Sequence, residues 1–343
     1  MQQSADQKLI LPTTSFPNGW FCIAYSDEIQ PGQVKIVHYF GRDLLVFRTE
    51  NGHPYVLDAH CPHLGTHLGY GGQVKGEEIQ CPLHGWCFDG NGDCTHIPNT
   101  TEMPLNVRAR SWPIQEIHEV IMVYYHSQGD SPTWEIPYLL EEPLEGKWQP
   151  FVKLLHRKAR THIQDVIQGV FDFIHAKTIH HAVYVAECEK LEFKGPICYD
   201  TYSLSVKVPF PVNLFLGKKL KIYFDLTHCG LGYSLIKQIA YEEKASPFQV
   251  LRVFNTPVDN DYCETRILAS IKQIINQPIT KALIPFIIHS TKISYEEDLP
   301  ILENRARYHA PLLSYGDGPI VKFRRWARQF YSSEQSTATK TPD

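Results

Sequence analysis

Several features that would place a chain in a common functional class are missing from these 343 residues. No apolar run reaches the roughly 20 residues that a membrane-spanning helix needs, and the best candidate, residues 282–288, is short and contains Pro285. Residues 1–8 show no basic segment followed by an apolar core, so we expect no signal peptide. The 33 Lys and Arg residues nearly balance the 37 Asp and Glu residues, and the net charge of -4 gives no reason to expect nucleic acid or an anionic membrane as a partner.

Cysteine and glycine patterns exclude two further classes. The nine cysteines are an odd number without a disulfide framework pattern, which is typical of a reducing compartment. We therefore expect a soluble, cytoplasmic protein. No Gly-x-Gly-x-x-Gly follows a predicted strand, so the chain has no recognisable site of its own for a nicotinamide or flavin cofactor.

The sequence does contain two Cys/His pairs in loops rich in proline and glycine, Cys61-Pro-His63 and Cys81-Pro-Leu-His84. Two thiolates and two imidazoles form a four-ligand set, and a [2Fe–2S] cluster can take cysteine on one iron and histidine on the other. The pattern therefore predicts a Rieske centre. A structural zinc ion is the alternative, although zinc modules usually pair Cys with Cys and His with His at short spacing.

Short β-rich runs separated by turns surround these loops. They predict a small all-β domain over residues 1–146, which ends in a linker rich in proline and glycine within residues 127–150. The predicted strands are residues 20–25, 34–40, 44–48, 107–112 and 116–125.

The rest of the chain predicts a second domain, residues 147–332, and a polar tail, residues 333–343. Five β-rich segments between residues 190 and 275 favour one antiparallel sheet. The fold class is thus α+β, with an all-β domain first and an antiparallel sheet flanked by helices after it. The predicted helices are residues 163–181, 296–308 and 320–331.

A second constellation, Asp172-x-x-His175-x4-His180, lies in the first of these helices. Two imidazoles and one carboxylate form the facial triad of non-haem Fe(II) proteins, which leaves coordination positions open. His180 follows His175 by five residues, so the helix must end or distort between them if both are to meet one metal. His181 competes with His180 for this role. The candidates for a distant carboxylate, among which spacing does not choose, are Asp259, Asp261, Glu264, Glu296, Glu297 and Asp298.

The four cluster residues, with the segments 85–88 and 90–94 that follow them, resemble the Rieske domain of the Rieske non-haem iron oxygenases. By this resemblance the two cysteines hold one iron of the cluster and the two histidines hold the other. The C-terminal part is similar to one subgroup, the 3-ketosteroid 9α-hydroxylase oxygenases and the cholesterol 7-desaturases of the Neverland type. The runs that carry this similarity are residues 296–313, 316–319 and 324–331.

The same resemblance implies roles for the second constellation. His175, His180 and Asp298 match the residues that hold the mononuclear iron in the subgroup. The family forms trimeric rings in which an acidic side chain links a cluster histidine of one subunit to an iron histidine of the next. This role maps on Asp172, between His84 and His175, and makes Asp172 an electron-transfer residue.

The implied function is that of a terminal oxygenase component, with residues 147–332 as its catalytic domain. Electrons from NAD(P)H would reach the [2Fe–2S] cluster through a separate reductase or ferredoxin and then Fe(II), where O2 would hydroxylate an apolar, sterol-like or polycyclic substrate. Two alternatives stay open: a desaturase with the same metal centres, and a Rieske electron-transfer protein without catalytic iron. Gln168-Gly169 stands where the family has an acidic-Asn pair, a departure that could alter the hydration of the iron site.

Overall fold

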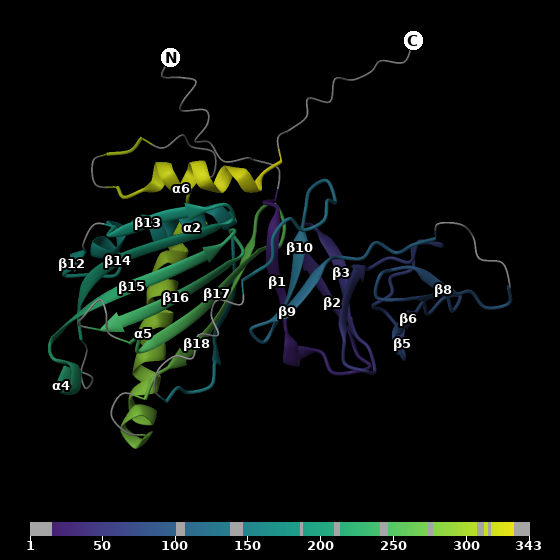
Figure 1. Cartoon of the computed structure of the whole chain (residues 1–343), viewed down its shortest axis with the longest axis horizontal. Coiled ribbons are helices and arrows are strands. Elements are labelled where there is room, and N and C mark those ends of the chain that lie inside the picture. Colours follow the sequence, from purple (N-terminus) through teal and green to yellow (C-terminus); the bar gives the residue numbers. More distant parts are fainter. Residues whose placement is uncertain are drawn as a thin grey trace, which may run out of the picture.

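The computed structural model describes residues 16–100, 107–137, 147–185, 188–208, 213–240, 246–273, 277–306, 312–314 and 317–332. Figure 1 shows two parts along the long axis, one made of small sheets and the other of a large twisted sheet crossed by a long helix. The predicted α+β class, with an all-β part first, is confirmed. The predicted boundary at residue 146, residues 1–15 of the predicted lead-in and the predicted tail lie outside the described residues.

The N-terminal part consists of three small antiparallel sheets, with strand orders β1-β10-β9, β2-β3-β4 and β5-β6-β7-β8. Large side chains fill the space beneath them, and Phe47 and Phe88 are fully buried. The strands are β1 (Gly19–Tyr25), β2 (Val34–Tyr39), β3 (Arg42–Arg48), β4 (Pro54–Asp58), β5 (Gln73–Lys75), β6 (Glu78–Gln80), β7 (Cys87–Phe88), β8 (Cys94–His96), β9 (Ile114–Ile117) and β10 (Val120–Tyr125), and the 3-10 helix η2 (Ser26–Glu28) follows β1.

Two strand predictions in this part were wrong in detail. Residues 116–125 belong to two strands, because the chain turns back at His118 and Glu119. Both have positive φ angles, 55° and 67°, so this tight turn forms without the glycine that would have signalled it. Residues 107–112 form no continuous ladder, because their backbone bonds first to the β7–β8 hairpin and then to β4.

The second part is built on one eight-stranded antiparallel sheet, in agreement with the predicted single sheet. Its order is β11-β18-β17-β16-β15-β14-β12, with β13 beside β14. The long strands β14 and β15 pair over 11 residues each. The strands are β11 (Val152–Ala159), β12 (Tyr184–Val185), β13 (Lys190–Lys194), β14 (Ile197–Lys207), β15 (Lys219–Cys229), β16 (Tyr233–Ala240), β17 (Gln249–Pro257) and β18 (Cys263–Ile271).

The helices lie against this sheet, and two of them differ from the prediction. The predicted helix 163–181 is broken into α2 and α3. Of the predicted helix 296–308, residues 296–303 are the end of a longer helix, α5, that begins at Gln277, and residues 307–308 lie outside the described residues. α5 packs on the sheet through Leu283 and Tyr295. The helices are α2 (Ile163–Phe171), α3 (His175–Thr178), α4 (Asn213–Leu216), α5 (Gln277–Glu303), α6 (Ile320–Ala327) and the 3-10 helix η3 (Arg328–Phe330).

The apolar run 282–288 lies inside α5, with Pro285 in the helix. Among the described residues, no helix combines the length and the hydropathy that crossing a membrane requires.

One buried cluster joins the two parts of the chain. Phe21 of β1 and Leu44 of β3 belong to it, and so do Phe171 of α2 and Phe323 of α6. All four side chains are fully buried, and burying one such side chain contributes about 1.5–3 kcal/mol. The small sheets and the helices α2 and α6 therefore depend on a common core.

Gly232, in the turn between β15 and β16, lies directly against β1. A Cβ atom there would overlap the carbonyl oxygen of Trp20 and lie 2.8 Å from Cδ1 of Phe21. Because a backbone oxygen cannot rotate away, we expect Gly232→Ala to lower the free energy of unfolding by about 1–3 kcal/mol, measured by denaturant unfolding.

Gly169→Ala is the matched control, because a Cβ atom at this position in α2 would meet open space. There alanine should stabilise the helix by about 0.5–1 kcal/mol. Equal stability of the two variants would contradict the role of Gly232.

Candidate metal centres

Two loops of the N-terminal part carry the predicted cluster ligands, and both close in the same way. One follows β4 and begins at Cys61, and the other follows β6 and begins at Cys81. In each, the cysteine N–H donates to the carbonyl five residues on, and the glycine four residues on donates to the cysteine carbonyl, with N···O distances of 2.8–3.0 Å. These glycines, Gly65 and Gly85, have φ angles of 75° and 72°, which other residues rarely adopt.

The cysteines of these loops are buried and the histidines lie at the surface. Cys61 and Cys81 are 2% and 3% exposed, whereas His63 and His84 are exposed. The two imidazole centroids are 4.8 Å apart, and Trp86 stacks on His63 at 4.3 Å. Burial above all, with the nearby Cys81 sulfur, raises the pKa of Cys61 to about 11. A thiolate at this position therefore requires a cation beside it.

The four side chains do not converge as the ligands of one ion would. Within the described ranges, one set of three ligand atoms has all its members within 4.8 Å of one another. It includes none of these four residues. Ligands of a single zinc ion lie about 2.0–2.3 Å from it and would satisfy that limit. The arrangement suits a two-iron cluster, which separates the cysteine pair from the histidine pair.

The second constellation begins where α2 stops. α2 ends at Phe171, and Asp172 leaves the helical conformation with φ -94° and ψ 80°. α3 then begins at His175 and ends at Thr178, two residues before His180. The helix therefore ends between the two histidines, as their five-residue spacing demands.

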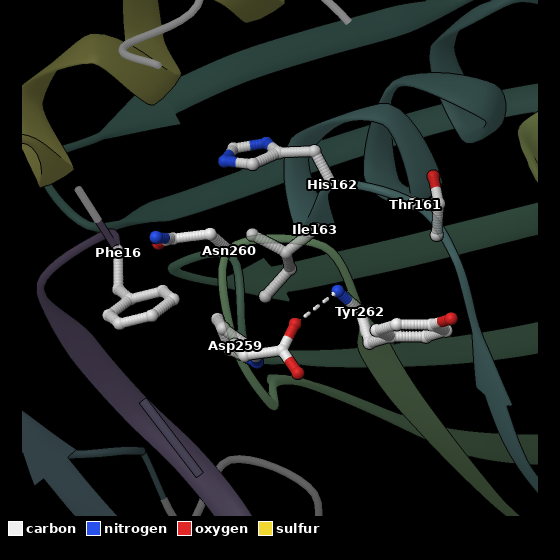
Figure 2. Close-up of a pocket in the computed structure, with 8 residues that line it drawn as sticks. Phe16, Thr161, His162, Ile163, Asp259, Asn260 and Tyr262 are labelled. Atoms are coloured by element: carbon white, nitrogen blue, oxygen red, sulfur yellow. Dashed lines mark hydrogen bonds between the residues drawn. The ribbon is translucent and has the colours of Figure 1, made fainter. Parts of the chain in front are cut away.

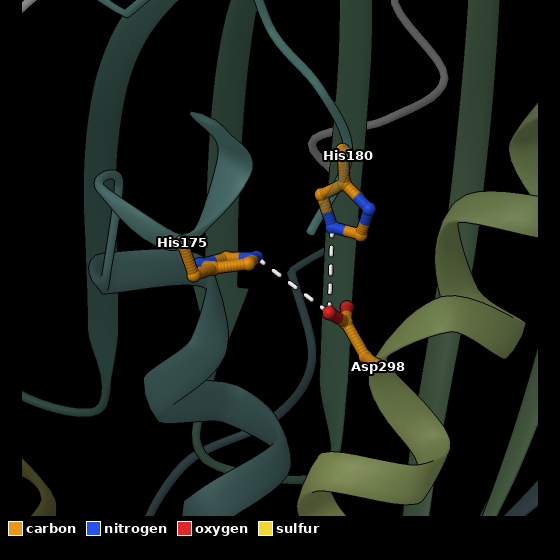
Figure 3. Close-up of side chains that lie close together, drawn as sticks. All are labelled: His175, His180 and Asp298. Carbon is orange, nitrogen blue, oxygen red and sulfur yellow. Dashed lines mark ion pairs between the residues drawn. The ribbon is translucent and has the colours of Figure 1, made fainter. Parts of the chain in front are cut away.

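Asp298 of α5 meets both histidines (Figure 3). Its Oδ1 lies 3.8 Å from Nε2 of His175 and 3.4 Å from Nε2 of His180, and one ligand atom from each residue lies within 4.8 Å of the others. Nitrogen and oxygen ligands lie about 2.0–2.2 Å from a first-row metal, so two ligands of one ion are at most roughly 4 Å apart. All three side chains are only partly exposed, between 19% and 29%.

Each imidazole has a second partner on its other nitrogen. Nδ1 of His175 meets the backbone carbonyl of Asp172, and Nδ1 of His180 lies 3.0 Å from Oε2 of Glu297. Both contacts leave Nε2 facing Asp298. Burial lowers the pKa of His180, but its hydrogen bonds to Asp298 and Glu297 outweigh burial and raise that pKa above its usual value.

The alternatives that the spacing left open lie elsewhere or have other partners. Glu264 pairs with Arg266 on β18, and Glu296 lies 3.4 Å from Arg157 of β11. His181, the competitor of His180, is exposed and has a φ angle of 53°. None of these side chains belongs to the set of three ligand atoms described above.

Two other candidate carboxylates, Asp259 and Asp261, lie in the turn between β17 and β18. Asp259 accepts hydrogen bonds of 2.8 Å from the backbone N–H groups of Asp261 and Tyr262, and it lines the pocket of Figure 2. The pocket volume of about 10 Å³ has room for roughly one water molecule. None of His175, His180 and Asp298 lines it, and its volume is too small for an organic substrate.

A buried polar network beneath α2 was not predicted from the sequence. Nδ1 of His228 lies 2.7 Å from Oγ of Ser234, and its Nε2 lies 3.0 Å from Oδ1 of Asp200. All three side chains are buried, and the ring of Phe171 packs on His228 at 5.2 Å. The three residues come from three adjacent strands, so only the register of the sheet brings them together.

Comparison with known proteins identifies both parts of the chain. Residues 19–113 match the family described as Rieske [2Fe-2S] domain, and residues 123–331 match the 3-ketosteroid 9alpha-hydroxylase C-terminal domain.

Among curated proteins, a cholesterol 7-desaturase of Ciona intestinalis is 32% identical over 338 residues, which covers 94% of this chain and 70% of that protein. The oxygenase component of a 3-ketosteroid-9-alpha-monooxygenase of Rhodococcus rhodochrous is 27% identical over 341 residues, covering 96% and 87%.

Among solved structures, dicamba monooxygenase bound to dicamba superposes with a TM-score of 0.70 at 17% identity, over 92% of this chain and 98% of that one. Pseudomonas putida CBB5 NdmA, as a mutant with caffeine, superposes with a TM-score of 0.68 at 18% identity, over 90% and 89%. Both likenesses show the fold.

A Rieske [2Fe–2S] domain joined to this catalytic fold defines an oxidoreductase of the Rieske oxygenase class. Within that class the chain belongs to the family of the 3-ketosteroid 9α-hydroxylases and cholesterol 7-desaturases, which confirms the resemblance seen in the sequence.

Proposed function

We propose that this chain is the terminal oxygenase of a multicomponent system that hydroxylates an apolar, sterol-like or polycyclic substrate. The observation that carries the proposal is the convergence of His175, His180 and Asp298 in a chain that also has a Rieske domain. Bound by these residues, a mononuclear Fe(II) would supply the chemistry of dioxygen activation. A Rieske electron carrier has no need of this second constellation.

The donor set fits such an iron. Two neutral imidazoles and one carboxylate are the ligands of the non-haem facial triad, which leaves positions open. His175 and His180 each present Nε2 to the site because their Nδ1 atoms are engaged by Asp172 and Glu297. No other His, Cys, Asp or Glu within the described ranges joins this set, so these residue types leave the remaining positions open there.

The cluster loops fit a [2Fe–2S] cluster in the same way. In this assignment the buried Cys61 and Cys81 hold the inner iron, and the exposed His63 and His84 hold the outer one. The exposed histidines then place the outer iron at the surface, where a partner can reach it. That partner is a separate reductase or ferredoxin, supplied with electrons by NAD(P)H.

We further propose a homotrimer in which each cluster serves the iron site of a neighbouring copy. The cluster loops adjoin β5 and β6, which lie at the opposite end of the long axis from α5 and its Asp298 (Figure 1). Beside the cluster histidines, Leu64 and Leu83 are 67% and 55% exposed, as suits a contact surface. With its carboxylate, Asp172 would accept a hydrogen bond from His84 of a neighbouring copy, while its backbone carbonyl contacts Nδ1 of His175 in its own copy. None of the nine cysteines forms a disulfide, which supports a cytoplasmic location.

Desaturation is the second candidate, because several similar curated proteins are named cholesterol 7-desaturases. The metal ligands are the same for both outcomes, so the product must decide. We expect turnover with a surrogate reductase to convert a member of a sterol and polycyclic panel into a product heavier by one oxygen atom. A product lighter by two hydrogen atoms would establish the desaturase instead, and consumption of no panel member would contradict the proposed substrate class. Mass spectrometry distinguishes these results.

Asp298→Ala tests the iron site. Removing one of three ligands should abolish retention of mononuclear iron and activity. The red-brown colour and the Rieske spectrum of the parent protein should persist, because α5, the helix that carries Asp298, lies in the other part of the molecule from β5 and β6 (Figure 1). Metal analysis and visible spectroscopy measure both. Glu303→Ala, an exposed carboxylate on the same helix, is the control. Parental iron content in Asp298→Ala, or a colourless zinc protein, would overturn the assignment.

Asp172→Asn tests the link between subunits. His175 is oriented by the backbone carbonyl of Asp172, which the substitution keeps, so both metal sites should stay occupied. A charge-assisted hydrogen bond is worth about 1.5–3 kcal/mol, so oxidation of the pre-reduced cluster after addition of substrate and O2 should slow by roughly 10- to 100-fold. Stopped-flow spectroscopy follows the cluster.

Asp130→Asn, at a largely exposed aspartate, is the matched control for this measurement. A trimeric Asp172→Asn variant that keeps both metals and oxidises its cluster at the parental rate would show that Asp172 is not on the route.

A further inference from the structure

His180 lies between two consecutive acidic residues of α5. Its Nδ1 is 3.0 Å from Oε2 of Glu297, and its Nε2 is 3.4 Å from Oδ1 of Asp298. Adjacent residues of a helix point about 100° apart, which allows neighbouring side chains to reach one imidazole from its two nitrogens. The two acids therefore contact the same ring at chemically different positions.

We propose that Glu297 is a positioning residue that fixes the ring and the tautomer of His180 for metal binding. The inference rests on the proposed function, because it assumes that His180 is a metal ligand. A carboxylate only accepts hydrogen bonds, so when Nε2 binds the metal, the nitrogen facing Glu297 must carry the proton of the neutral ring. Nε2 then keeps its lone pair and points to the side of Asp298, as metal-ligating histidines do when a carboxylate holds their other nitrogen.

The geometry separates this role from that of a ligand. Glu297 does not belong to the set formed by His175, His180 and Asp298, and it contacts the nitrogen of His180 that faces away from Asp298. Glu297 thus acts through His180 and does not touch the metal.

The two histidines are also held by different kinds of acceptor. Nδ1 of His175 donates to a neutral backbone carbonyl, that of Asp172, whereas Nδ1 of His180 donates to a carboxylate. A carboxylate raises the basicity of the imidazole more than a carbonyl does. His180 is therefore the stronger donor of the pair, and removal of Glu297 should change the ligand field as well as the affinity.

The test is a metal titration that does not depend on turnover. The cluster-loaded protein is freed of its mononuclear metal with a chelator and titrated anaerobically with Co²⁺, followed by calorimetry and by the Co²⁺ d–d bands. Loss of such an outer partner typically costs about 10- to 100-fold in metal affinity, so Glu297→Ala should weaken Co²⁺ binding by this factor and shift the bands. Glu297→Gln, whose amide oxygen still accepts, should recover part of the affinity.

Glu296→Ala is the matched control, since this neighbouring carboxylate pairs with Arg157 and Lys292 and has no contact with His180. It should bind Co²⁺ like the parent. Parental affinity in Glu297→Ala, or a Glu297→Gln variant no better than Glu297→Ala, would overturn the positioning role. Complete loss of binding in Glu297→Ala, equal to that of Asp298→Ala, would make Glu297 a ligand instead.

His180→Ala and Asp298→Ala distinguish failure of the Glu297 role from failure of the metal centre itself. If both lose Co²⁺ while Glu297→Ala binds like the parent, the positioning role falls and the metal centre stands. If both bind Co²⁺ like the parent, the proposed metal centre is wrong, and so is the proposed role of Glu297. In every variant the Rieske spectrum reports an intact cluster, and the far-UV circular dichroism spectrum and the unfolding midpoint report that the catalytic part is folded.

Discussion

Two imidazoles five residues apart cannot face the same point from one continuous helix, and the proposed iron site depends on how the chain resolves this constraint. After α2 stops at Phe171, the short helix α3 begins at His175 and already ends at Thr178, before His180. The last carbonyls of a helix lack partners within it, and here the carbonyl of Asp172 meets Nδ1 of His175. The break before His175 thus provides the group that orients the first ring, and the end of α3 at Thr178 lets the second ring turn toward the same point.

Packing around the end of α2 holds this break in place. Phe171 is fully buried, with Phe323 of α6 stacked on it at 4.5 Å and His228 of the sheet beside it. Gln168, also buried, accepts a hydrogen bond of 2.6 Å from Nε of Arg324 on α6. Gln168 therefore has a structural partner on α6, whereas a Cβ atom at Gly169 would meet no atom within 4 Å. The C-terminal helix α6 is in this way part of the support of the metal centre.

A feature could be predicted from the sequence where residues close together in the chain determine it, and not where residues far apart in the chain do. The cluster loops are local, so Cys61, His63, Cys81 and His84 were assigned from spacing alone. The carboxylate opposite the histidines was not, because nothing in a 118-residue separation from His180 to Asp298 distinguishes it from five other acids; only the resemblance singled it out. The start of α5 was missed because a proline in an apolar run favours a loop. Networks assembled across strands, such as that of His228, leave no local pattern at all.

The two centres therefore differ in what they need from the fold. Each cluster loop closes on itself within six residues, through backbone hydrogen bonds that involve no distant element. The iron site instead requires α2, α3 and α5 to be held at fixed positions by the shared core and the large sheet. Disturbance of that core should therefore misplace Asp298 relative to the histidines before it alters the cluster loops, because local closure survives small shifts between elements and convergence of distant side chains does not. The chain thus combines cluster loops that close locally with a proposed iron site whose geometry depends on the tertiary structure.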